Sequence, residues 1–399
     1  MGAFNAVKIT DKVYWVGAID WGIRDFHGYL TTRGTTYNAY LVLADKVTLV
    51  DTVKKPFFCE MMERIKSVIE PQKIAYIVSN HSEIDHSGAL TDAISVVKPE
   101  KVFASVNGVE NLRAHFHEDL NLVAVKDGEK LNLGDANILF VETKMLHWPD
   151  SMASYLIEEK VLFSQDGFGM HLATGERFAD EISEEILCYE ATKYYANILL
   201  PFSSLILRLI ERIKSLGIEI RILAPDHGPI WRKEIDKIVG WYASFAEQKR
   251  ARKAVVVYDT MWGSTARMGS AICEGLISCG VSVKQMSLKS CHRSDVVTEL
   301  LDAGAIAVGS PTLNNGVFPT VADLLTYIKG LKMKNLLGVA FGSYGWSGEA
   351  LKILNESLSQ AGILLVSDGV KVRFVPGEGA LKECYSLGVL VGENLRRRY

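Results

Sequence analysis

The feature that most constrains the fold is a strict alternation of short apolar segments and helical segments from residue 253 to the end of the chain. An apolar segment, an amphipathic helix and another apolar segment are typical of a βαβ unit, whose crossover makes neighbouring strands parallel. The apolar segments are KAVVVYD, VSVKQMS, GAIAVGS, NLLGVAFG and a late stretch near residues 364–374. We therefore expect residues 251–399 to form a doubly wound parallel sheet of five strands.

Residues 1–250 follow a different pattern, in which strand-length segments are mixed with long helical ones. The stretch 37–51 predicts two strands around a turn, and five later apolar runs predict further strands. These runs are KIAYIVS, KVFAS, ANILFVET, KVLFSQD and EIRILAP. Residues 183–215 predict one long amphipathic helix. The polar and basic segment 246–253 separates the two patterns, so we predict one domain over 1–250 and a second over 251–399.

Composition excludes several classes of protein. The chain is 48% hydrophobic and 23% charged with a formal net charge of −3, as in an ordinary globular protein without the basic excess that nucleic acid requires. No apolar run reaches the ~20 residues of a membrane span, and the N-terminus lacks the pattern of a secretory signal. The six cysteines form no C-x-x-C pair, which argues against a thiolate metal site. We expect a cytoplasmic protein.

Histidine and carboxylate residues provide the richest chemical signal. Seven of them share one property, because each follows a predicted strand closely: His81, Glu83, Asp85, His86, His147, Asp166 and His227. Loops at strand ends bring ligands together from distant parts of a chain, and glycine or proline beside the candidates allows the backbone to turn. Alternate residues of an extended turn can point the same way, while the adjacent Asp85 and His86 can diverge toward a second ion. The pattern predicts a metal site.

The motif H-x-E-x-D-H at residues 81–86 resembles the H-x-H-x-D-H motif of the metallo-β-lactamase superfamily. Glu83 replaces the second histidine, and the added carboxylate favours iron over zinc. Together with LHWPDS and the flavodoxin-like second half, this motif resembles the flavodiiron proteins, also called A-type flavoproteins or rubredoxin:oxygen oxidoreductases. The resemblance extends from YWVGAIDW and GTTYNAYL to the final helix.

This resemblance implies a metallo-β-lactamase-like αβ/βα sandwich that holds two non-haem irons, followed by a flavodoxin-like domain. The ligands are then divided between the two ions. His81, Glu83 and His147 hold the iron nearer the flavin, Asp85, His86 and His227 hold the other, and Asp166 bridges them. The implied reaction is the four-electron reduction of dioxygen to water, the reduction of nitric oxide to nitrous oxide, or both.

Three residues outside the ligand set are hypothetical proton donors. His171, Tyr195 and His27 lie near ligand-bearing segments in the sequence, and the family has similar residues. Packing or support of the ligands is the alternative role for each of them.

Three loops predict an FMN site in the second half. The first opens a predicted helix, whose N-terminal N–H groups suit a phosphate, and it contains Thr260, Met261, Trp262, Gly263, Ser264 and Thr265. The other two follow predicted strands and contain Pro311, Thr312, Leu313, Asn314, Asn315, Gly316, Ser343, Tyr344, Gly345, Trp346, Ser347 and Gly348. Trp346 or Tyr344 is expected to stack on the flavin ring, although a core position is the alternative for Trp346. FMN is preferred because no G-x-G-x-x-G motif occurs.

The resemblance also predicts partners. It implies a head-to-tail homodimer or a dimer of dimers, and an external electron donor, usually rubredoxin, with reduced coenzyme F420 as the alternative, because we expect no fused rubredoxin. The basic runs 249–252 and 396–398 would attract an acidic donor, or they are simply solvated.

Two rival functions remain open from the sequence. One is a metallo-β-lactamase-type hydrolase with zinc and Asp85 as its base. The other is a flavodoxin-like electron carrier whose first half is a docking or dimerisation module with a degenerate metal site. Glu83 and the flavodoxin-like half argue against the hydrolase, and the seven retained ligand positions argue against the carrier.

Overall fold

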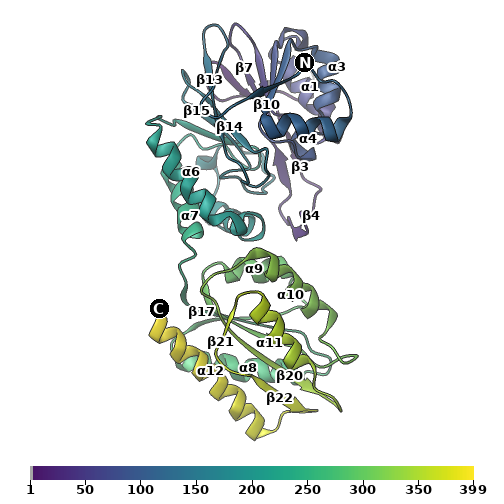
Figure 1. Cartoon of the computed structure of the whole chain (residues 1–399), viewed down its shortest axis with the longest axis vertical. Helices are drawn as coiled ribbons and strands as arrows, with labels where there is room; N and C mark the ends of the chain where they lie inside the picture. Colours follow the sequence, from purple (N-terminus) through teal and green to yellow (C-terminus); the bar gives the residue numbers. More distant parts are fainter. Residues whose placement is uncertain (1–2) are drawn as a thin grey trace. The chain divides into compact units, whose positions relative to one another are not determined.

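The computed structural model of the protein describes residues 3–399, which divide into two compact units (Figure 1). The first unit contains the described residues up to Tyr194 together with Ser204–Ala243. The second unit contains Tyr195–Ser203 and Ser244–Tyr399. The chain therefore passes between the units at residues 194–195, 203–204 and 243–244.

The first unit contains a seven-stranded sheet. Its strands, in spatial order, are β1 (Val7–Lys8), β2 (Val13–Trp15), β7 (Tyr40–Val42), β8 (Thr48–Val50), β9 (Tyr76–Ser79), β10 (Lys101–Ser105) and β11 (Leu122–Val125). The pairs from β1 to β8 are antiparallel, and those from β8 to β11 are parallel. Two small separate sheets pair β3 (Ala18–Asp20) with β6 (Thr35–Tyr37), and β4 (Asp25–Phe26) with β5 (Tyr29–Leu30).

Helices cover one face of the seven-stranded sheet. The helical segments in this part are η1 (Lys55–Phe57), α1 (Phe58–Lys66), η2 (Pro71–Lys73), α2 (Ile84–Ser87), α3 (Leu90–Val97) and α4 (Val106–Phe116). Successive strand residues point to opposite faces, so Ile77 of β9 packs with Met61 of α1 and Leu112 of α4. Its neighbour Val78 instead packs on the opposite face, in a cluster with Phe163.

The second sheet of this unit packs on that opposite face. Its strands, in spatial order, are β12 (Lys130–Asn132), β13 (Asn137–Glu142), β14 (Met152–Leu156), β15 (Val161–Gln165) and β16 (Ile222–Pro225). Phe140 and Phe163 enter the core between the two sheets, whereas Leu162 turns outward to a cavity shared with Ile210 and Val239 of helices α6 (Ser203–Ser215) and α7 (Ile235–Glu247). This is the expected αβ/βα sandwich.

The single long helix predicted over residues 183–215 is wrong. The structure has η3 (Ala179–Glu181), then α5 (Glu184–Tyr194), a π-helical turn η4 (Tyr195–Leu199), a 3₁₀ turn η5 (Leu200–Phe202) and α6. Pro201 lies in the 3₁₀ turn, where its missing N–H prevents a continuous α-helical ladder. The interruption divides the segment between the two units.

The second unit is a doubly wound parallel sheet. Its strands are β17 (Ala251–Tyr258), β18 (Ser282–Ser287), β19 (Ala303–Gly309), β20 (Leu337–Tyr344), β21 (Leu364–Leu365) and β22 (Val370–Arg373), in the order β18-β17-β19-β20, with β21 and β22 both pairing β20. The fifth position of the predicted sheet is thus shared by two short strands. Helices α8 (Ser264–Ser278) and α12 (Glu378–Arg398) pack together, while α9 (Arg293–Leu300), α10 (Pro319–Leu331) and α11 (Ala350–Gln360) form the other layer (Figure 1).

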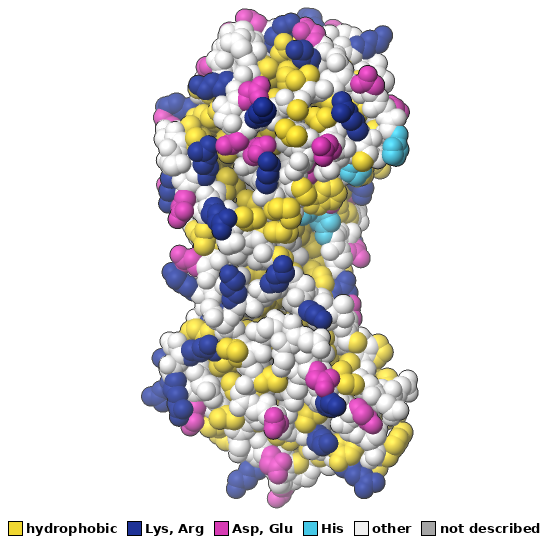
Figure 2. Space-filling view, in the orientation of Figure 1, with side chains coloured by type: hydrophobic (Ala, Val, Ile, Leu, Met, Phe, Trp, Pro, Cys, Tyr) yellow, Lys and Arg dark blue, Asp and Glu magenta, His cyan; other side chains and the backbone are white. Residues whose placement is uncertain are grey.

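On the face that Figure 2 shows, Lys and Arg side chains are mixed with Asp and Glu side chains in both units. Within residues 3–399, no helix is both long enough and apolar enough to cross a membrane.

Candidate metal centre and ligand pocket

Strand ends in the first unit bring the seven predicted metal ligands together. His81 follows β9 after one residue, and Asp85 and His86 lie in the short helix α2. Asp166 directly follows β15, and His227 lies two residues beyond β16. The remaining two, Glu83 and His147, come from the loops before α2 and β14. The seven side chains form two groups of buried or half-buried metal-ligating atoms.

The first group contains His81, Glu83, His147 and Asp166. Glu83 Oε2 lies 3.2 Å from Nε2 of His81 and 3.2 Å from Nε2 of His147. Asp166 Oδ2 lies 3.4 Å from the same nitrogen of His81 and 3.2 Å from that of His147. Two imidazole nitrogens and two carboxylate oxygens therefore converge on one small volume.

The second group contains Asp85, His86 and His227. Asp85 Oδ2 lies 3.2 Å from Nε2 of His86 and 3.0 Å from Nε2 of His227. The other carboxylate oxygen of Asp166, Oδ1, lies 3.3 Å from His86 Nε2 and 3.5 Å from His227 Nε2. Asp166 therefore presents one oxygen to each group, which is the arrangement of a bridging ligand.

The geometry of these contacts fits a pair of metal ions. Both oxygens of Asp85 and Asp166 and the Nε2 atoms of His86 and His147 are buried, and they make no hydrogen bond within residues 3–399. These atoms lie close together, but their relative orientation does not suit hydrogen bonds. Donor atoms that surround a shared metal ion have this arrangement. Four imidazoles and three carboxylates form a donor set with much oxygen, which suits iron better than zinc.

The charges in the cluster stabilise one another. Burial alone would lower the pKa of His81, but its hydrogen bonds to Asp150 and Glu83 outweigh burial and raise the pKa to about 10. For His147, burial is likewise outweighed by Asp166 and Glu83, and its pKa rises to about 9. A metal ion has to displace these protons, since only the neutral imidazole is a ligand.

The carboxylates shift in the opposite direction. Burial favours the neutral acid, yet the side chains of His147, His27 and His81 hold the pKa of Glu83 far below its usual range. The pKa of Asp166 is also held well below its usual range, because His86 and His147 outweigh the effect of its burial. Both carboxylates are therefore anionic ligands at neutral pH.

Sequence reasoning missed the residues that orient the ligands from behind. Asp150 Oδ2 lies 3.3 Å from Nδ1 of His81 and accepts a hydrogen bond from the backbone N–H of Ser82. His227 Nδ1 lies 2.6 Å from the Thr36 carbonyl oxygen. Such partners set the tautomer of a ligating histidine. Asp150 lies in the sequence segment LHWPDS, and this motif was the signal that could have identified it.

A pocket of about 450 Å³ lies in the second unit at the carboxyl ends of its strands. The predicted residues that line it are Met261, Trp262, Ser264, Pro311, Thr312, Leu313, Asn314, Ser343, Tyr344, Gly345 and Trp346. Phe374 and Val375, which follow β22, also line it and were not foreseen. The sequence offered a signal for these two residues, because the fifth strand of a doubly wound sheet ends at the same edge as the other strands.

The other predicted loop residues support the pocket wall. The Thr260 hydroxyl oxygen accepts the backbone N–H of Gly263, which has the left-handed φ of 88° that favours glycine. Buried Thr265 contacts the hydroxyl of Ser343 at 3.1 Å. Asn315, Gly316, Ser347 and Gly348 belong to the same loops without lining the pocket.

The aromatic residues of the pocket lie on its surface. Trp346 is 90% exposed and Trp262 is 89% exposed, so neither is a core residue. Two exposed indoles beside a pocket of this volume form stacking surfaces for a planar ring system. The proposed core position of Trp346 is therefore wrong, and a ligand-stacking role stays a prediction.

Comparisons with known proteins agree with both units. Residues 35–228 match the family described as ODP family beta lactamase, and residues 256–388 match the flavodoxin family. A nitric oxide reductase of Moorella thermoacetica is 46% identical over 96% of this chain and 97% of its own. The chain belongs to the flavodiiron protein family.

Solved structures support the same assignment. The rubredoxin oxygen:oxidoreductase of Desulfovibrio gigas has a TM-score of 0.97 at 45% identity, covering 98% of this chain and 99% of its own. The flavodiiron protein of Giardia intestinalis has a TM-score of 0.95 at 33% identity, covering 100% and 98%. The predicted fold is confirmed, and the cofactors are FMN and a diiron centre.

Two of the three predicted proton donors lie at the metal-ligand cluster of this flavodiiron protein. His27 Nε2 lies 2.6 Å from Glu83 Oε1, and the ring of His171 packs against that of His227 with centroids 4.5 Å apart. Burial, followed by the charges of His227 and His27, lowers the pKa of His171. The structure places Tyr195 in the second unit, where its hydroxyl donates to Ser203. Its sequence neighbour Tyr194 contacts His171 instead, with ring centroids 5.0 Å apart, and Tyr29 lies 5.6 Å from the same ring.

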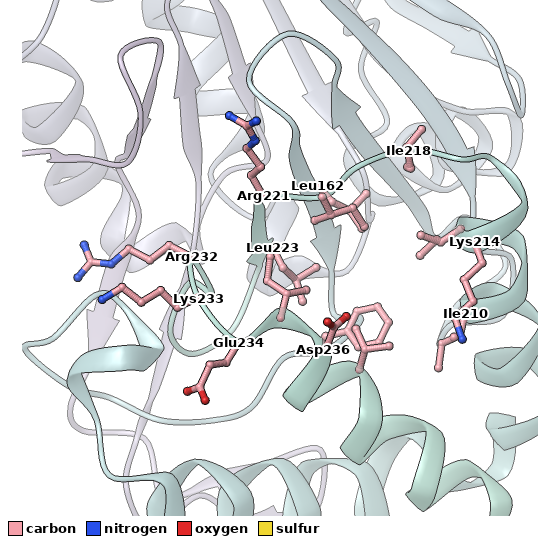
Figure 3. A pocket seen from close by; sticks show the side chains of 15 residues that line it. Leu162, Ile210, Lys214, Ile218, Arg221, Leu223, Arg232, Lys233, Glu234 and Asp236 are labelled. Atoms are coloured by element: carbon pink, nitrogen blue, oxygen red, sulfur yellow. The ribbon is translucent and has the colours of Figure 1, made fainter.

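Another cavity of the first unit, of about 590 Å³, has no comparable chemistry (Figure 3). Leu162, Leu223 and Ile210 line its apolar interior, while Arg221 and Arg232 extend away from it. Both arginines form ion pairs, with Glu219 and Asp180 respectively. The flavodiiron protein therefore places its reactive groups at the strand ends and not in this cavity.

Proposed function

We propose that this chain is an oxidoreductase that reduces dioxygen to water, nitric oxide to nitrous oxide, or both, with electrons from an external carrier. Dioxygen takes up four electrons and four protons to give two waters. Two nitric oxide molecules take up two electrons and two protons to give nitrous oxide and water. Relatives named nitric oxide reductase and rubredoxin-oxygen oxidoreductase support both substrates.

The observation that carries this proposal is the position of Asp166 between two groups of ligands. Its two carboxylate oxygens face different histidine pairs, so the first unit is built to hold two ions side by side. Two irons so held supply the binding and electron storage for a diatomic molecule. The aromatic pocket of the second unit supplies the place for FMN.

The side chains of the chain supply orientation and protons. We propose that His81, Glu83 and His147 hold one iron, that Asp85, His86 and His227 hold the other, and that Asp166 bridges them. Asp150 and the Thr36 carbonyl keep their histidines in one orientation. His27 and His171 are the proposed proton-bearing groups, because both lie at the cluster and neither is in the ligand set.

For FMN, the proposal assigns binding to the three predicted loops. The N–H groups at the start of α8 face the phosphate, and Trp346 or Tyr344 stacks on the ring. The electron donor is proposed to be rubredoxin, after the relative named rubredoxin-oxygen oxidoreductase. Reduced F420 is the alternative, after the relative named coenzyme F420H(2) oxidase.

We also propose that the chain works as a head-to-tail homodimer or as a dimer of such dimers. Two sets of exposed apolar side chains support this assembly. In the first unit, Ile84 and Met145 are exposed close in sequence to proposed ligands. In the second unit, Trp346 and Phe374 are exposed at the pocket. A head-to-tail contact covers both sets, and a fully active monomer in sedimentation velocity would contradict it.

The test is gas consumption by the full chain loaded with FMN and iron, measured with an electrode under anaerobic supply of chemically reduced rubredoxin. Loss of dioxygen without peroxide, or loss of nitric oxide with formation of nitrous oxide, is the expected result. If neither gas is consumed while two irons and one FMN are bound, and reduced F420 gives the same result, the proposal fails. Hydrolysis assays on the zinc-loaded chain then test the rival function.

A further inference from the structure

His171 differs from the proposed ligand histidines in its surroundings. His81, His86, His147 and His227 each have a carboxylate oxygen within 3.5 Å of Nε2. Among the described residues, His171 has no carboxylate oxygen within ion-pair distance. Its ring neighbours are Phe26, His27, Tyr29, Tyr194 and His227. No anion adjoins this imidazole to hold a second proton, so only one of its two nitrogens carries a proton.

The two nitrogens of His171 have unequal environments. Nδ1 lies 2.7 Å from the hydroxyl oxygen of Thr35, a fully buried residue of β6. Nε2 is also buried, and it has no hydrogen-bond partner in the part of the chain that the structure describes. Nδ1 is therefore fixed by the protein, and Nε2 is the atom that His171 can offer to a molecule at the cluster.

The hydroxyl group of Thr35 has three partners within reach. His171 Nδ1 is at 2.7 Å, the Thr36 carbonyl oxygen is at 3.2 Å and His227 Nδ1 is at 3.3 Å. His227 Nδ1 bears a proton when His227 uses Nε2 as a ligand, so it cannot accept from Thr35, and it donates that proton to the Thr36 carbonyl at 2.6 Å. The shorter contact and the occupied carbonyl both favour donation to His171.

We propose that Thr35 is a positioning residue that holds His171 as the tautomer with its proton on Nε2, and so keeps an N–H donor available beside the proposed metal ligands. This role rests on the proposed function, because gas reduction consumes protons at this centre. The tautomer itself is a property of the folded chain and is measured independently of turnover.

The tautomer is read by long-range ¹H–¹⁵N correlation of histidine rings in the full-length, ¹⁵N-labelled protein. Zinc in place of iron keeps the spectrum free of paramagnetic broadening, and His171→Asn identifies the signals. The expected result is a protonated Nε2 and an unprotonated Nδ1. A proton on Nδ1 in the wild-type protein would overturn the proposal.

Three variants isolate the contribution of the hydroxyl. Thr35→Val removes it at nearly constant volume and is expected to give a mixture of both tautomers, whereas Thr35→Ser is expected to keep the wild-type pattern. Thr48→Val is the matched control, because Thr48 is equally buried and donates to a backbone carbonyl, that of Lys46. An unchanged tautomer in Thr35→Val would refute the role of Thr35, and Thr35→Ser guards against misfolding.

Turnover of the iron-loaded variants is measured in a separate experiment. Thr35→Val is expected to lower kcat for gas reduction about tenfold, a fraction of what general acid catalysis contributes, with KM for the electron donor and the FMN and iron contents unchanged. Thr35→Ser is expected to restore kcat. If the wild-type protein consumes neither gas, the proposed function fails while the tautomer assignment stands. If the tautomer shifts in Thr35→Val but kcat does not fall, the catalytic purpose is refuted.

Discussion

The two units place their chemistry at strand ends in opposite ways. In the first unit the proposed ligands are buried or half-buried, and each carboxylate lies within 3.5 Å of at least one of the histidines that its charge stabilises. In the second unit the pocket is open, and its largest side chains, Trp262 and Trp346, face solvent. One site is organised by charge in the interior, and the other by apolar surface at the exterior.

The difference has a physical reason. A metal ion requires several anionic or neutral ligands at fixed positions, and burial strengthens the electrostatic attraction that holds them. A flavin ring is large and planar, and it gains binding energy from stacking and from apolar area. Loss of one charge should therefore abolish the first site, whereas loss of one aromatic ring should only weaken the second.

The largest effect is expected for Asp166→Asn. The variant removes the charge that both histidine groups share, so we expect loss of bound iron and a fall in gas turnover of at least about a hundredfold. FMN content should be unchanged, since the flavin pocket is built from other loops. Metal analysis and flavin absorbance check both. Asp236→Asn, on an exposed residue of the same unit, is the control, and full iron content in Asp166→Asn would break the comparison.

The next effect is the pH dependence of metal uptake. In the metal-free protein the pKa values of His81 and His147 are raised to about 10 and about 9. Burial of His86 is likewise outweighed by Asp85 and Asp166, which raise its pKa well above the usual range, so all three rings are protonated at neutral pH. Metal binding releases these three protons, and the apparent affinity should therefore rise about a thousandfold per pH unit below pH 9. Calorimetry in buffers of different protonation enthalpy counts the protons. His147→Asn should release one fewer, and absence of proton release at pH 7 would contradict the charge network.

A smaller loss is expected for Asp150→Asn. The amide oxygen can still accept the N–H of Ser82, but the negative charge beside Nδ1 of His81 is lost. We expect a 10- to 100-fold weaker metal affinity, the range for partners that stand behind a ligating histidine. Competition with a chelator measures it, with Asp92→Asn on the same unit as control. An unchanged affinity would mean that the position of His81 is set by packing alone.

Sequence patterns were sufficient for most of the fold and for finding the cluster of histidines and carboxylates that we propose as metal ligands. Alternating apolar segments identify strands because burial on a sheet has a period of two, and the ligands follow because they stand directly after those strands. The helix break at 195–202 was harder, since its residues are mostly apolar and Pro201 is the main mark of it.

The supporting contacts could not be read from the sequence. Thr35 and His171 are 136 positions apart, and His81 and Asp150 are 69 apart, so no local pattern connects them. Adjacent residues point in directions about 100° apart on a helix, and sequence alone could not choose Tyr194 over Tyr195 as the neighbour of His171. Arg250 appeared to be a docking residue, yet its guanidinium is buried and donates to the carbonyls of Lys334, Leu300 and Leu301.

Trp346→Ala tests the open pocket. The loss of one stacking ring, worth about 1 kcal/mol beyond its area, should weaken FMN binding about tenfold and leave the iron content unchanged. Titration of the flavin-free protein, followed by quenching of FMN fluorescence, measures the change. Trp346→Phe should retain most of the affinity, and Trp21→Ala, an exposed tryptophan of the first unit, is the control. Equal affinity in all variants would remove Trp346 from the flavin site.

The smallest effect concerns the donor. Because Arg250 is buried, the basic run 249–252 offers only Lys249 and Arg252 to an acidic electron carrier. Exposed charges steer association over about a Debye length, roughly 10 Å at 0.1 M salt, so Lys249→Glu with Arg252→Glu should about halve the association rate of reduced rubredoxin at low salt. Stopped-flow reduction of FMN measures this rate. The effect should vanish at high salt. The double variant Lys98→Glu with Lys101→Glu, on the first unit, is the control, and it should show no effect because the donor is expected to bind the flavin-bearing unit. An equal loss in both double variants would show that net charge, and not this run, sets the rate.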